Sequence, residues 1–373
     1  MGDPIFTRHS FTTETERRGI SFESDGRASK SVAEKAARQA ATTKKLHPSV
    51  DPATEPIHRS LLRFSPYEDK FRVTVGLPVP IESTCDVTGS MGDNVQIMLG
   101  VLPQTYELIS KVLPGCDPQL SLGIFGDEVD DFIMSRPQFE MTAEKIVEYC
   151  ANLFSSGSGG DYPEDPQYSV YAAAYLTDAY INKIGLKGYH FLITDAPMHG
   201  TVYKRNLRRI FGKQVFDAVR DNGFDLPDTP AVEQLFEDMK KIFHAFILLV
   251  DSNANDFWSS YYDGAHIVQI DSTKYLPQVE AAIIGLTEAT LEPAELKQFL
   301  IDTQVPAAEA EKLARKLLRV EYGAQRKLEE ASGYKLPQKG DIFDRKTDLQ
   351  PSGHIDEEKE ETPIENASSG TWL

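Results

Sequence analysis

The sequence lacks the features that define several classes of protein. Only three cysteines (Cys85, Cys116 and Cys150) occur among 373 residues, with no Cys-x-x-Cys pair, which excludes a disulfide framework and a structural zinc site of that type. No run approaches the roughly 18 apolar residues of a membrane span. The first residues contain no apolar stretch of the kind found in secretory signals, and Phe6 stands where a myristoylation motif has Ser or Thr. We therefore expect a soluble cytoplasmic protein.

Cations are also scarce, because 39 Lys and Arg face 57 Asp and Glu, for a net charge of −18. Such a balance argues against nucleic-acid binding, which depends on clustered cations. The charge is uneven: residues 26–48 hold six cations and one anion, whereas residues 341–373 hold nine acids and three bases. Both ends are poor in large apolar residues. We expect residues 1–55 to form a flexible basic arm and residues 336–373 a disordered acidic tail.

Between these ends, apolar runs of strand length alternate with helical patterns. We expect strands within 71–75, 76–85, 120–125, 189–194, 242–250 and 266–270, and helices starting near 93 and within 142–152, 168–183, 230–241 and 273–288. This alternation predicts an α/β domain, over residues 56–290, with a mostly parallel sheet covered by helices on both faces. Residues 291–335 are amphipathic, strand-free and carry Pro at helix starts, which predicts a small helical appendix.

Three of the loops that follow these strands are rich in oxygen atoms: residues 86–92, residues 155–165 and residues 194–196. Ligands of open parallel sheets bind at the carboxyl ends of the strands, where these loops lie. In the first loop, Asp86, Thr88 and Ser90 alternate, so their oxygens can converge on one point. One carboxylate and two hydroxyls, joined by carboxylates from the other loops, suit a hard cation such as Mg²⁺.

The same loops resemble a known family. The segment DVTGSMG at 86–92 resembles the Asp-x-Ser/Thr-x-Ser signature of the von Willebrand factor A (vWA) domain family, and LITDAP at 192–197 resembles its Ile-Thr-Asp loop. LGIFGDEVDDF at 122–132 is similar to the family's second-strand segment. GSGGDYPEDP at 157–166 resembles the form found in intracellular members associated with alpha-kinases. The resemblance covers roughly residues 72–290.

The resemblance implies a Rossmann-like, doubly wound vWA fold with a metal-ion-dependent adhesion site. The ligands that it implies are Asp86, Thr88, Ser90, Asp161 and Asp195, around Mg²⁺, Mn²⁺ or Ca²⁺. Better-known members have Thr where this sequence has Asp161. A third carboxylate would strengthen metal retention and weaken the attraction of the site for the acidic side chain of a protein partner, which completes the metal's coordination in the adhesion members.

We therefore expect a metal-dependent protein-interaction module, an adaptor or assembly subunit, rather than an enzyme, because no catalytic set is recognisable. One alternative is a metal-dependent phosphohydrolase or phosphotransferase. Asp-x-Thr after a first strand resembles haloacid-dehalogenase-like enzymes, but these need a second acid at the position of Thr88, and only Lys187 and His190 lie near a strand as candidate groups. The other alternative is a structural subunit of a larger particle, with the arms lacing subunits together.

Several residues have simpler interpretations. The first loop on its own is compatible with a strand-to-helix turn in which Asp and Ser cap the helix. Glu164 and Asp165 are expected as acids of a first helical turn, stabilised by the helix dipole. His190, His244 and His266 fall in predicted strands, as core or edge residues. The basic run at 204–213 is expected to form a solvated helix face or a docking patch for an acidic partner.

Overall fold

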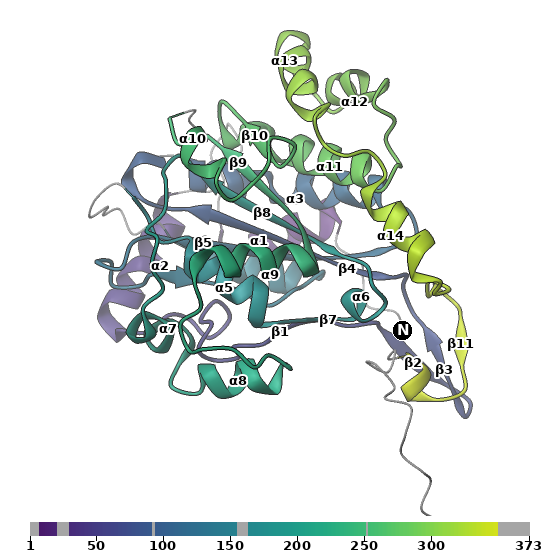
Figure 1. Cartoon of the computed structure of the whole chain (residues 1–373), viewed down its shortest axis with the longest axis horizontal. Helices are drawn as coiled ribbons and strands as arrows, with labels where there is room; N and C mark the ends of the chain where they lie inside the picture. The colour runs from purple at the N-terminus through teal and green to yellow at the C-terminus, as the bar shows by residue number, and fades with distance from the viewer. Residues whose placement is uncertain (1–6, 21–29, 92–93, 155–162, 251–252, 350–373) are drawn as a thin grey trace, which may run out of the picture.

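A computed structural model describes residues 7–20, 30–91, 94–154, 163–250 and 253–349. Its centre is a six-stranded sheet in the order β10-β9-β8-β4-β5-β6 (Figure 1). All neighbouring strands are parallel except β6, which runs antiparallel to β5. The strands are β4 (Pro78–Asp86), β5 (Asp117–Phe125), β6 (Met134–Ser135), β8 (Gly188–Thr194), β9 (Phe243–Leu249) and β10 (Ile267–Gln269). The expected α/β class with a mostly parallel sheet is confirmed.

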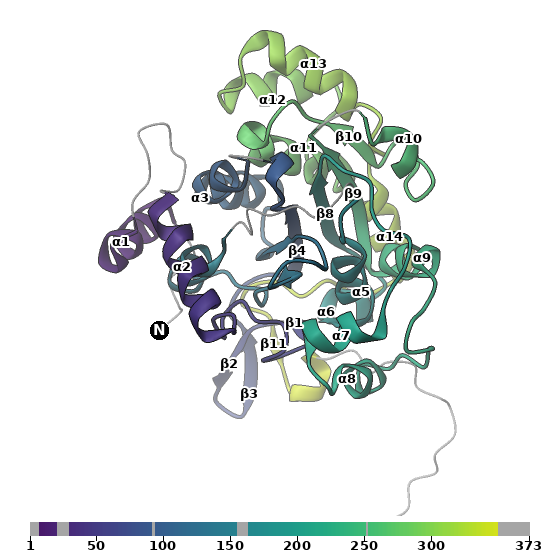
Figure 2. The ribbon, with the colours of Figure 1, turned by 90° about the vertical axis from the view of Figure 1, so that its left-hand side faces the viewer.

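The central strands are buried on both faces, as their unbroken apolar sequences predict. Along β8, Tyr189, Phe191 and Ile193 belong to one hydrophobic core, whereas Leu192 belongs to the other. Helices α3 (Asn94–Val112) and α11 (Leu276–Thr287) cover the first face, and α5 (Gln167–Tyr175) and α9 (Val232–Ile242) cover the second (Figure 2). The alternation of side chains along a strand therefore fills two cores from one sequence.

The order of the strands creates a crevice at one end of the sheet. The chain leaves β4 through α3 and reaches β5 on one side, then returns through α4 (Ala143–Asn152) and α5 to β8 on the other side of β4. The loops after β4 and β8 consequently leave the sheet in opposite directions. This is the topological switch point at which doubly wound sheets bind their ligands.

Two expected elements differ from the structure. Residues 71–75 were expected within the main α/β alternation, but β3 (Lys70–Val73) forms a hairpin with β2 (Phe64–Tyr67), and β11 (Ile342–Phe343) adds a third antiparallel strand. Residues 168–183 are not one helix. The chain leaves α5 at Leu176, pairs as β7 (Thr177–Ala179) with β1 (His58–Ser60), and resumes as α6 (Tyr180–Lys183). Tertiary strand pairing overrides the helical pattern there.

The described parts of both ends contact the α/β domain. In the expected arm, α1 (Arg8–Arg18) and α2 (Lys30–Thr43) pack against α4, and Phe11 is buried. The expected appendix contains α12 (Leu296–Asp302), α13 (Ala307–Leu317) and α14 (Ala324–Ser332), and no strand. β11 lies within the expected acidic tail. The boundaries at residues 55, 290 and 335 stay predictions. Two helices precede the expected α/β domain in the chain, and three helices and the strand β11 follow it among the described residues.

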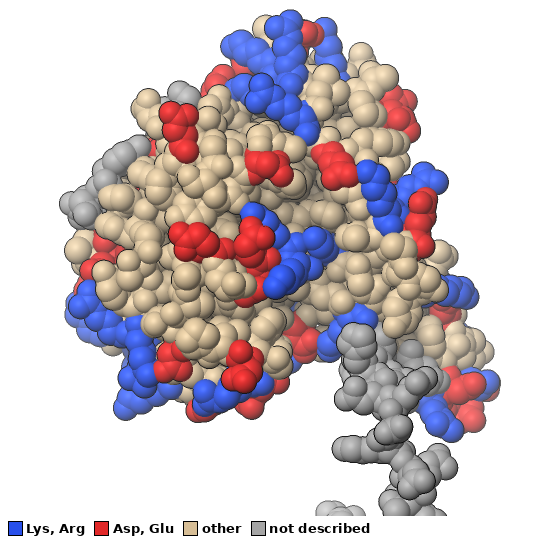
Figure 3. All heavy atoms as spheres, in the orientation of Figure 1, with Lys and Arg blue, Asp and Glu red and all other residues tan. Residues whose placement is uncertain are grey.

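The remaining helices are α7 (Lys204–Phe211), α8 (Val215–Asp221) and α10 (Asn255–Trp258). Within the described part of the chain, no helix is both long and apolar enough to cross a bilayer. Figure 3 shows acidic and basic side chains interspersed over one face, with Lys and Arg gathered at the top of the view, over the α12–α13 region.

A buried ion pair joins the edge of the sheet to its centre. Arg136, which follows β6, donates from Nε to Oε1 of Glu82 on β4 at 2.6 Å and from Nη2 to Oε2 at 2.9 Å, and both side chains are fully buried. Arg136 also donates to the Leu176 carbonyl and to the Thr177 hydroxyl. The guanidinium thereby connects β4 to the break between α5 and β7.

We predict that Arg136→Met lowers the free energy of unfolding by about 3–5 kcal/mol, because it leaves the Glu82 carboxylate buried without its partner. Urea unfolding checks this. The matched control is Arg59→Met, which removes a surface pair with Glu55 and should cost at most about 1 kcal/mol. The double variant Glu82→Leu/Arg136→Met should recover part of the loss. Equal effects of Arg136→Met and Arg59→Met would contradict this assignment.

Candidate metal site

The loop after β4 is organised around Asp86. Its side chain is fully buried, and its Oδ1 accepts hydrogen bonds from the Thr88 backbone N–H at 2.9 Å and from the Thr88 hydroxyl at 2.7 Å. The Thr88 hydroxyl lies 3.3 Å from that of Ser90, which is exposed. The alternation of these three residues therefore does bring their oxygens together, with Thr88 between the other two.

The loop after β8 meets the first loop at the switch point. Ser90 Oγ donates to Asp195 Oδ1 at 3.0 Å, and Thr194 Oγ1 donates to Asp86 Oδ2 at 2.8 Å. The indole N–H of Trp258, on α10, donates to the carbonyl of Ala196 at 2.9 Å and holds this loop in place. Four of the five expected ligands, Asp86, Thr88, Ser90 and Asp195, are thus joined by one set of hydrogen bonds.

The fifth expected ligand, Asp161, lies outside the described residues, as does most of the second loop. The described end of that loop places Glu164 beside the site. Glu164 pairs in a bridge with Met198, its carbonyl accepts from the His199 N–H at 2.8 Å, and only 3% of its surface is exposed. Its Oε2 has no hydrogen-bond partner among the described residues.

Glu164 was expected as a first-turn acid, and this was wrong, since α5 starts only at Gln167. The signal was present in the sequence. Pro166 disfavours helical geometry at Asp165, so a helix can begin only after this pair of acids. The glutamate is therefore held beside the loop that contains Met198, where its side chain is buried and its carboxyl interacts with Asp86 and Thr88.

The site brings buried carboxyl groups close together, with only its Ser90 and Asp195 side open to solvent. Burial, together with the nearby charge of Asp195, raises the pKa of Asp86 to about 6 against the opposing hydrogen bonds from Thr88 and Thr194. Burial, together with the neighbouring charge of Asp86, raises the pKa of Glu164 to about 8, although a hydrogen bond from Thr88 opposes this. Burial also raises the pKa of Asp165 to about 6. Carboxyl groups in this state are stabilised by either protons or a cation.

Softer donors do not contribute to the site in the described part of the chain. The thiol of Cys85 donates to the Asp86 carbonyl, and burial raises its pKa well above the ordinary value, so it stays protonated. His190 lies in β8 beside Glu82 and is fully buried. Lys187 precedes β8 at the opposite end of the sheet from Asp86. Neither of these two groups reaches the crevice.

The basic run on α7 has a structural role near the second loop. Arg205 and Asn206 donate to the carboxylate of Glu128, and Arg209 donates to the Glu128 carbonyl at 2.8 Å. Glu128 in turn donates its backbone N–H to Asp165 at 2.6 Å. These residues of α7 are thus bound to the loop after β5, and through Glu128 they hold that loop against Asp165.

The donor set fits a hard dication in its chemistry. Carboxylates and hydroxyls are the ligands that Mg²⁺ and Ca²⁺ prefer, and the buried, unpartnered oxygen of Glu164 is a group whose burial a cation would compensate. Asp86, Thr88, Ser90 and Asp195 would hold the ion, with Glu164 next to them. Among the described residues, no three side chains of His, Cys, Asp or Glu form a metal-binding cluster by themselves, so an ion at this place would be held partly by hydroxyl oxygens.

No protein-family model and no curated protein matches the sequence. Among the solved structures that match, the similarity of the two described next is weak. Proximal thread matrix protein 1 from the mussel byssus aligns at 11% identity over 56% of this chain and 45% of its own, with a TM-score of 0.33. The pilus adhesin SpaC from Lactobacillus rhamnosus GG aligns at 13% identity over 61% of this chain and 34% of its own, with a TM-score of 0.37. The chain thus matches less than half of either protein, and similarity at this level defines neither family nor function.

We predict that the metal-free protein becomes less stable as the pH rises from about 5 to 8. The pKa of Glu164 is about 8 in the folded state against an ordinary 4.5, so over this range the folded state binds the extra proton, and its stabilising effect is lost as that proton dissociates. Glu164→Gln should reduce this dependence, to which the buried Glu280 and Glu288 also contribute, and be more stable than the parent at pH 8. Urea unfolding in EDTA at several pH values measures the effect.

The control for this experiment is Glu233→Gln, which changes an exposed carboxylate on α9. It should follow the parent at every pH. If the free energy of unfolding of Glu164→Gln changes with pH as that of the parent does, Glu164 has an ordinary pKa and does not interact with the neighbouring carboxyl groups.

Proposed function

We propose that the chain is a cytoplasmic, non-enzymatic interaction module that binds a protein partner through a metal-ion-dependent adhesion site of the vWA type. The observation that carries the proposal is the set of hydrogen bonds that joins Asp86, Thr88, Ser90 and Asp195 at the switch point. Three of these residues come from the loop after β4 and one from the loop after β8, as the vWA resemblance requires. Bound there, a divalent cation would supply a Lewis-acidic centre that accepts a carboxylate oxygen from the partner.

The exposure of the residues supports the direction from which a partner would approach. Asp86 and Thr88 are buried, Asp195 is partly exposed, and Ser90 is exposed. The buried pair would hold the ion from the side of the sheet, and the exposed side of the site would face the partner. Because Glu164 adds a carboxyl group next to Asp86, we expect tight metal retention and a weaker attraction for an incoming carboxylate.

The arrangement offers less support for a phosphohydrolase. Thr88 donates its hydroxyl to Asp86 at the position where haloacid-dehalogenase-like enzymes need a second acid. The two candidate groups for such chemistry, Lys187 and His190, lie away from the crevice. Turnover of p-nitrophenyl phosphate with Mg²⁺, abolished by Asp86→Asn, is the result that would favour the enzyme over the interaction module.

We predict that Mg²⁺ or Mn²⁺ stabilises the folded protein, since an ion that binds only the native state adds about 2.7 kcal/mol at a hundredfold excess over Kd. Thermal melting with each metal and with EDTA measures this. Asp86→Asn and Ser90→Ala should fold in EDTA and lose the stabilisation. Asp302→Asn, on the surface of α12, is the control and should keep it. A melting temperature that changes neither with added metal nor with EDTA would rule the site out.

We further predict that the metal-loaded protein selects acidic peptides. A displayed random-peptide library, bound in Mg²⁺ and eluted with EDTA, should become enriched in Asp or Glu at one position. The enriched peptides should not bind the Ser90→Ala variant, because that residue lies on the exposed side of the site. Enrichment of peptides without a shared acid, or binding that persists in EDTA, would argue for a structural subunit whose contacts lie elsewhere.

A further inference from the structure

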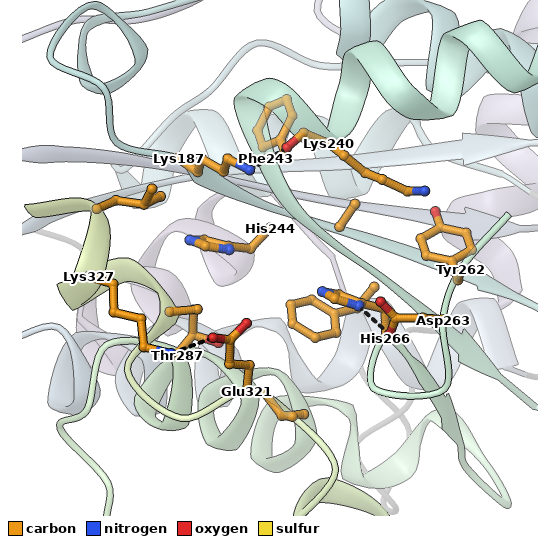
Figure 4. A pocket seen from close by; sticks show the side chains of 15 residues that line it. Lys187, Lys240, Phe243, His244, Tyr262, Asp263, His266, Thr287, Glu321 and Lys327 are labelled. Atoms are coloured by element: carbon orange, nitrogen blue, oxygen red, sulfur yellow. Dashed lines mark hydrogen bonds and ion pairs between the residues drawn. The ribbon is translucent and has the colours of Figure 1, made fainter. Parts of the chain in front are cut away.

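A cavity lies toward the amino ends of the strands, at the opposite end of the sheet from the candidate metal site. It has a volume of about 430 Å³ and lies where the first half of β9, the end of α9, the segment before β10 and α14 meet (Figure 4). Cavities of roughly 300–1,000 Å³ hold small organic ligands. Nothing in the proposed function uses this cavity, and the inference below is independent of the metal site.

The cavity follows from a mismatch in length between two strands. β10 begins at Ile267, opposite Ile247, so the first half of β9 has no neighbour on that side. The Ile247 N–H donates to the His266 carbonyl, and before that point the chain turns away, with the His266 N–H donating to the Asp263 carbonyl. The edge of β9 is thus unpaired by β10 at Phe243–Phe246, and α14 lies over this edge.

One residue of this open edge presents a complete hydrogen-bonding pair. Backbone groups two residues apart in a strand point the same way, so the N–H and C=O of Ala245 point to the side where Ile247 meets β10. β10 begins only opposite Ile247, so no strand of the described chain lies beside these two groups, although Ala245 is only 2% exposed. Buried backbone groups almost always have a partner, and a ligand with an adjacent donor and acceptor would supply both.

Aromatic rings and cations surround this pair. Phe246 and His266 lie with their ring centroids 5.0 Å apart. The Tyr262 hydroxyl is buried without a hydrogen-bond partner among the described residues. The Lys240 ammonium, which also pairs with Glu237 at 2.9 Å, lies 5.9 Å from the Tyr262 ring at the same end of the cavity (Figure 4). The lysines of the lining, Lys187, Lys240 and Lys327, outnumber its two carboxylates, Asp263 and Glu321.

A buried glutamine fixes the other wall. Gln325 of α14 accepts from the Lys187 N–H and donates to the Lys187 carbonyl, which orients its amide. His244 Nε2 lies 2.8 Å from Gln325 Oε1 and must therefore donate its proton there. Burial lowers the pKa of His244 to about 4, so the ring is neutral and its Nδ1 is an acceptor. Hydrogen bonds among Gln325, His244 and the Lys187 backbone thus fix this wall of the cavity.

We propose that this cavity binds a purine nucleotide. The donor–acceptor edge of the base would pair with the C=O and N–H of Ala245, since adenine presents an amino donor next to a ring-nitrogen acceptor. The faces of the base would stack on aromatic rings of the lining, a contact that every base can make. The phosphate would lie toward the Tyr262 hydroxyl and the Lys240 ammonium, because both donate to anions.

The test is isothermal titration calorimetry of the full chain with adenosine monophosphate, in EDTA so that the candidate metal site is empty of ions. We expect one saturable site, with adenosine weaker because it lacks the anion and ribose 5-phosphate inactive because it lacks the base. Lys240→Gln should weaken binding about tenfold, as for one charge-assisted hydrogen bond. Lys241→Gln, the exposed neighbour that pairs with Asp238 outside the cavity, should bind as the parent does.

Two further variants make the result decisive. Ala324→Phe places a ring in the cavity from a half-buried position on α14 and should abolish binding while the circular dichroism spectrum is retained. Tyr262→Phe should weaken binding several-fold without lowering the melting temperature, because the hydroxyl has no partner in the described protein. The proposal is overturned if millimolar adenosine monophosphate does not bind, if ribose 5-phosphate binds equally well, or if folded Ala324→Phe binds like the parent.

Discussion

The cost of burying charge on the central strand is the constraint on which the rest of the structure depends. Every residue of β4 is buried, and two of its nine residues, Glu82 and Asp86, are acids. Each must be compensated by other elements, because a buried charge without a partner is strongly destabilising. Glu82 is compensated by Arg136. That ion pair needs the Leu176 carbonyl and the Thr177 hydroxyl as additional acceptors, which requires the helical pattern of residues 168–183 to be interrupted at this point.

Asp86 is compensated in another way, and less completely. Hydroxyl and backbone donors surround it, but no cation does among the described residues. The same sheet therefore holds one acid whose charge is neutralised internally and, four residues further along the strand, one whose charge is only partly balanced. Burial of Glu164 beside it increases the imbalance. Unbalanced buried carboxyl groups are stabilised by protons, and would be stabilised by a cation if one bound, whereas the Glu82–Arg136 pair is already neutralised internally.

The sequence was sufficient to predict the class of the fold and the meeting of the loops. The alternation of apolar runs located the five parallel strands of the central sheet, β4, β5, β8, β9 and β10, because a doubly buried strand needs an unbroken apolar run. It did not locate the short antiparallel strand β6. It placed Asp86, Thr88, Ser90 and Asp195 at strand ends, and the structure brings these four together. It did not locate the addition of β11 to β3, the β7 break or the bridge between Glu164 and Met198, since each depends on partners distant in the sequence.

The pairing of β11 with β3 has a consequence for how the chain acquires its structure. β2 and β3 are made early in synthesis, yet their third strand, Ile342–Phe343, is among the last of the described residues. A contact between segments so far apart in sequence forms slowly, because the intervening chain must first be brought together. During translation, β3 therefore has an unpaired edge for almost the whole time that the α/β domain is assembling. An unpaired edge of this kind is a site at which a nascent chain can pair with the wrong partner. Because β11 has only two residues, the pairing that finally covers the edge of β3 is short as well as late.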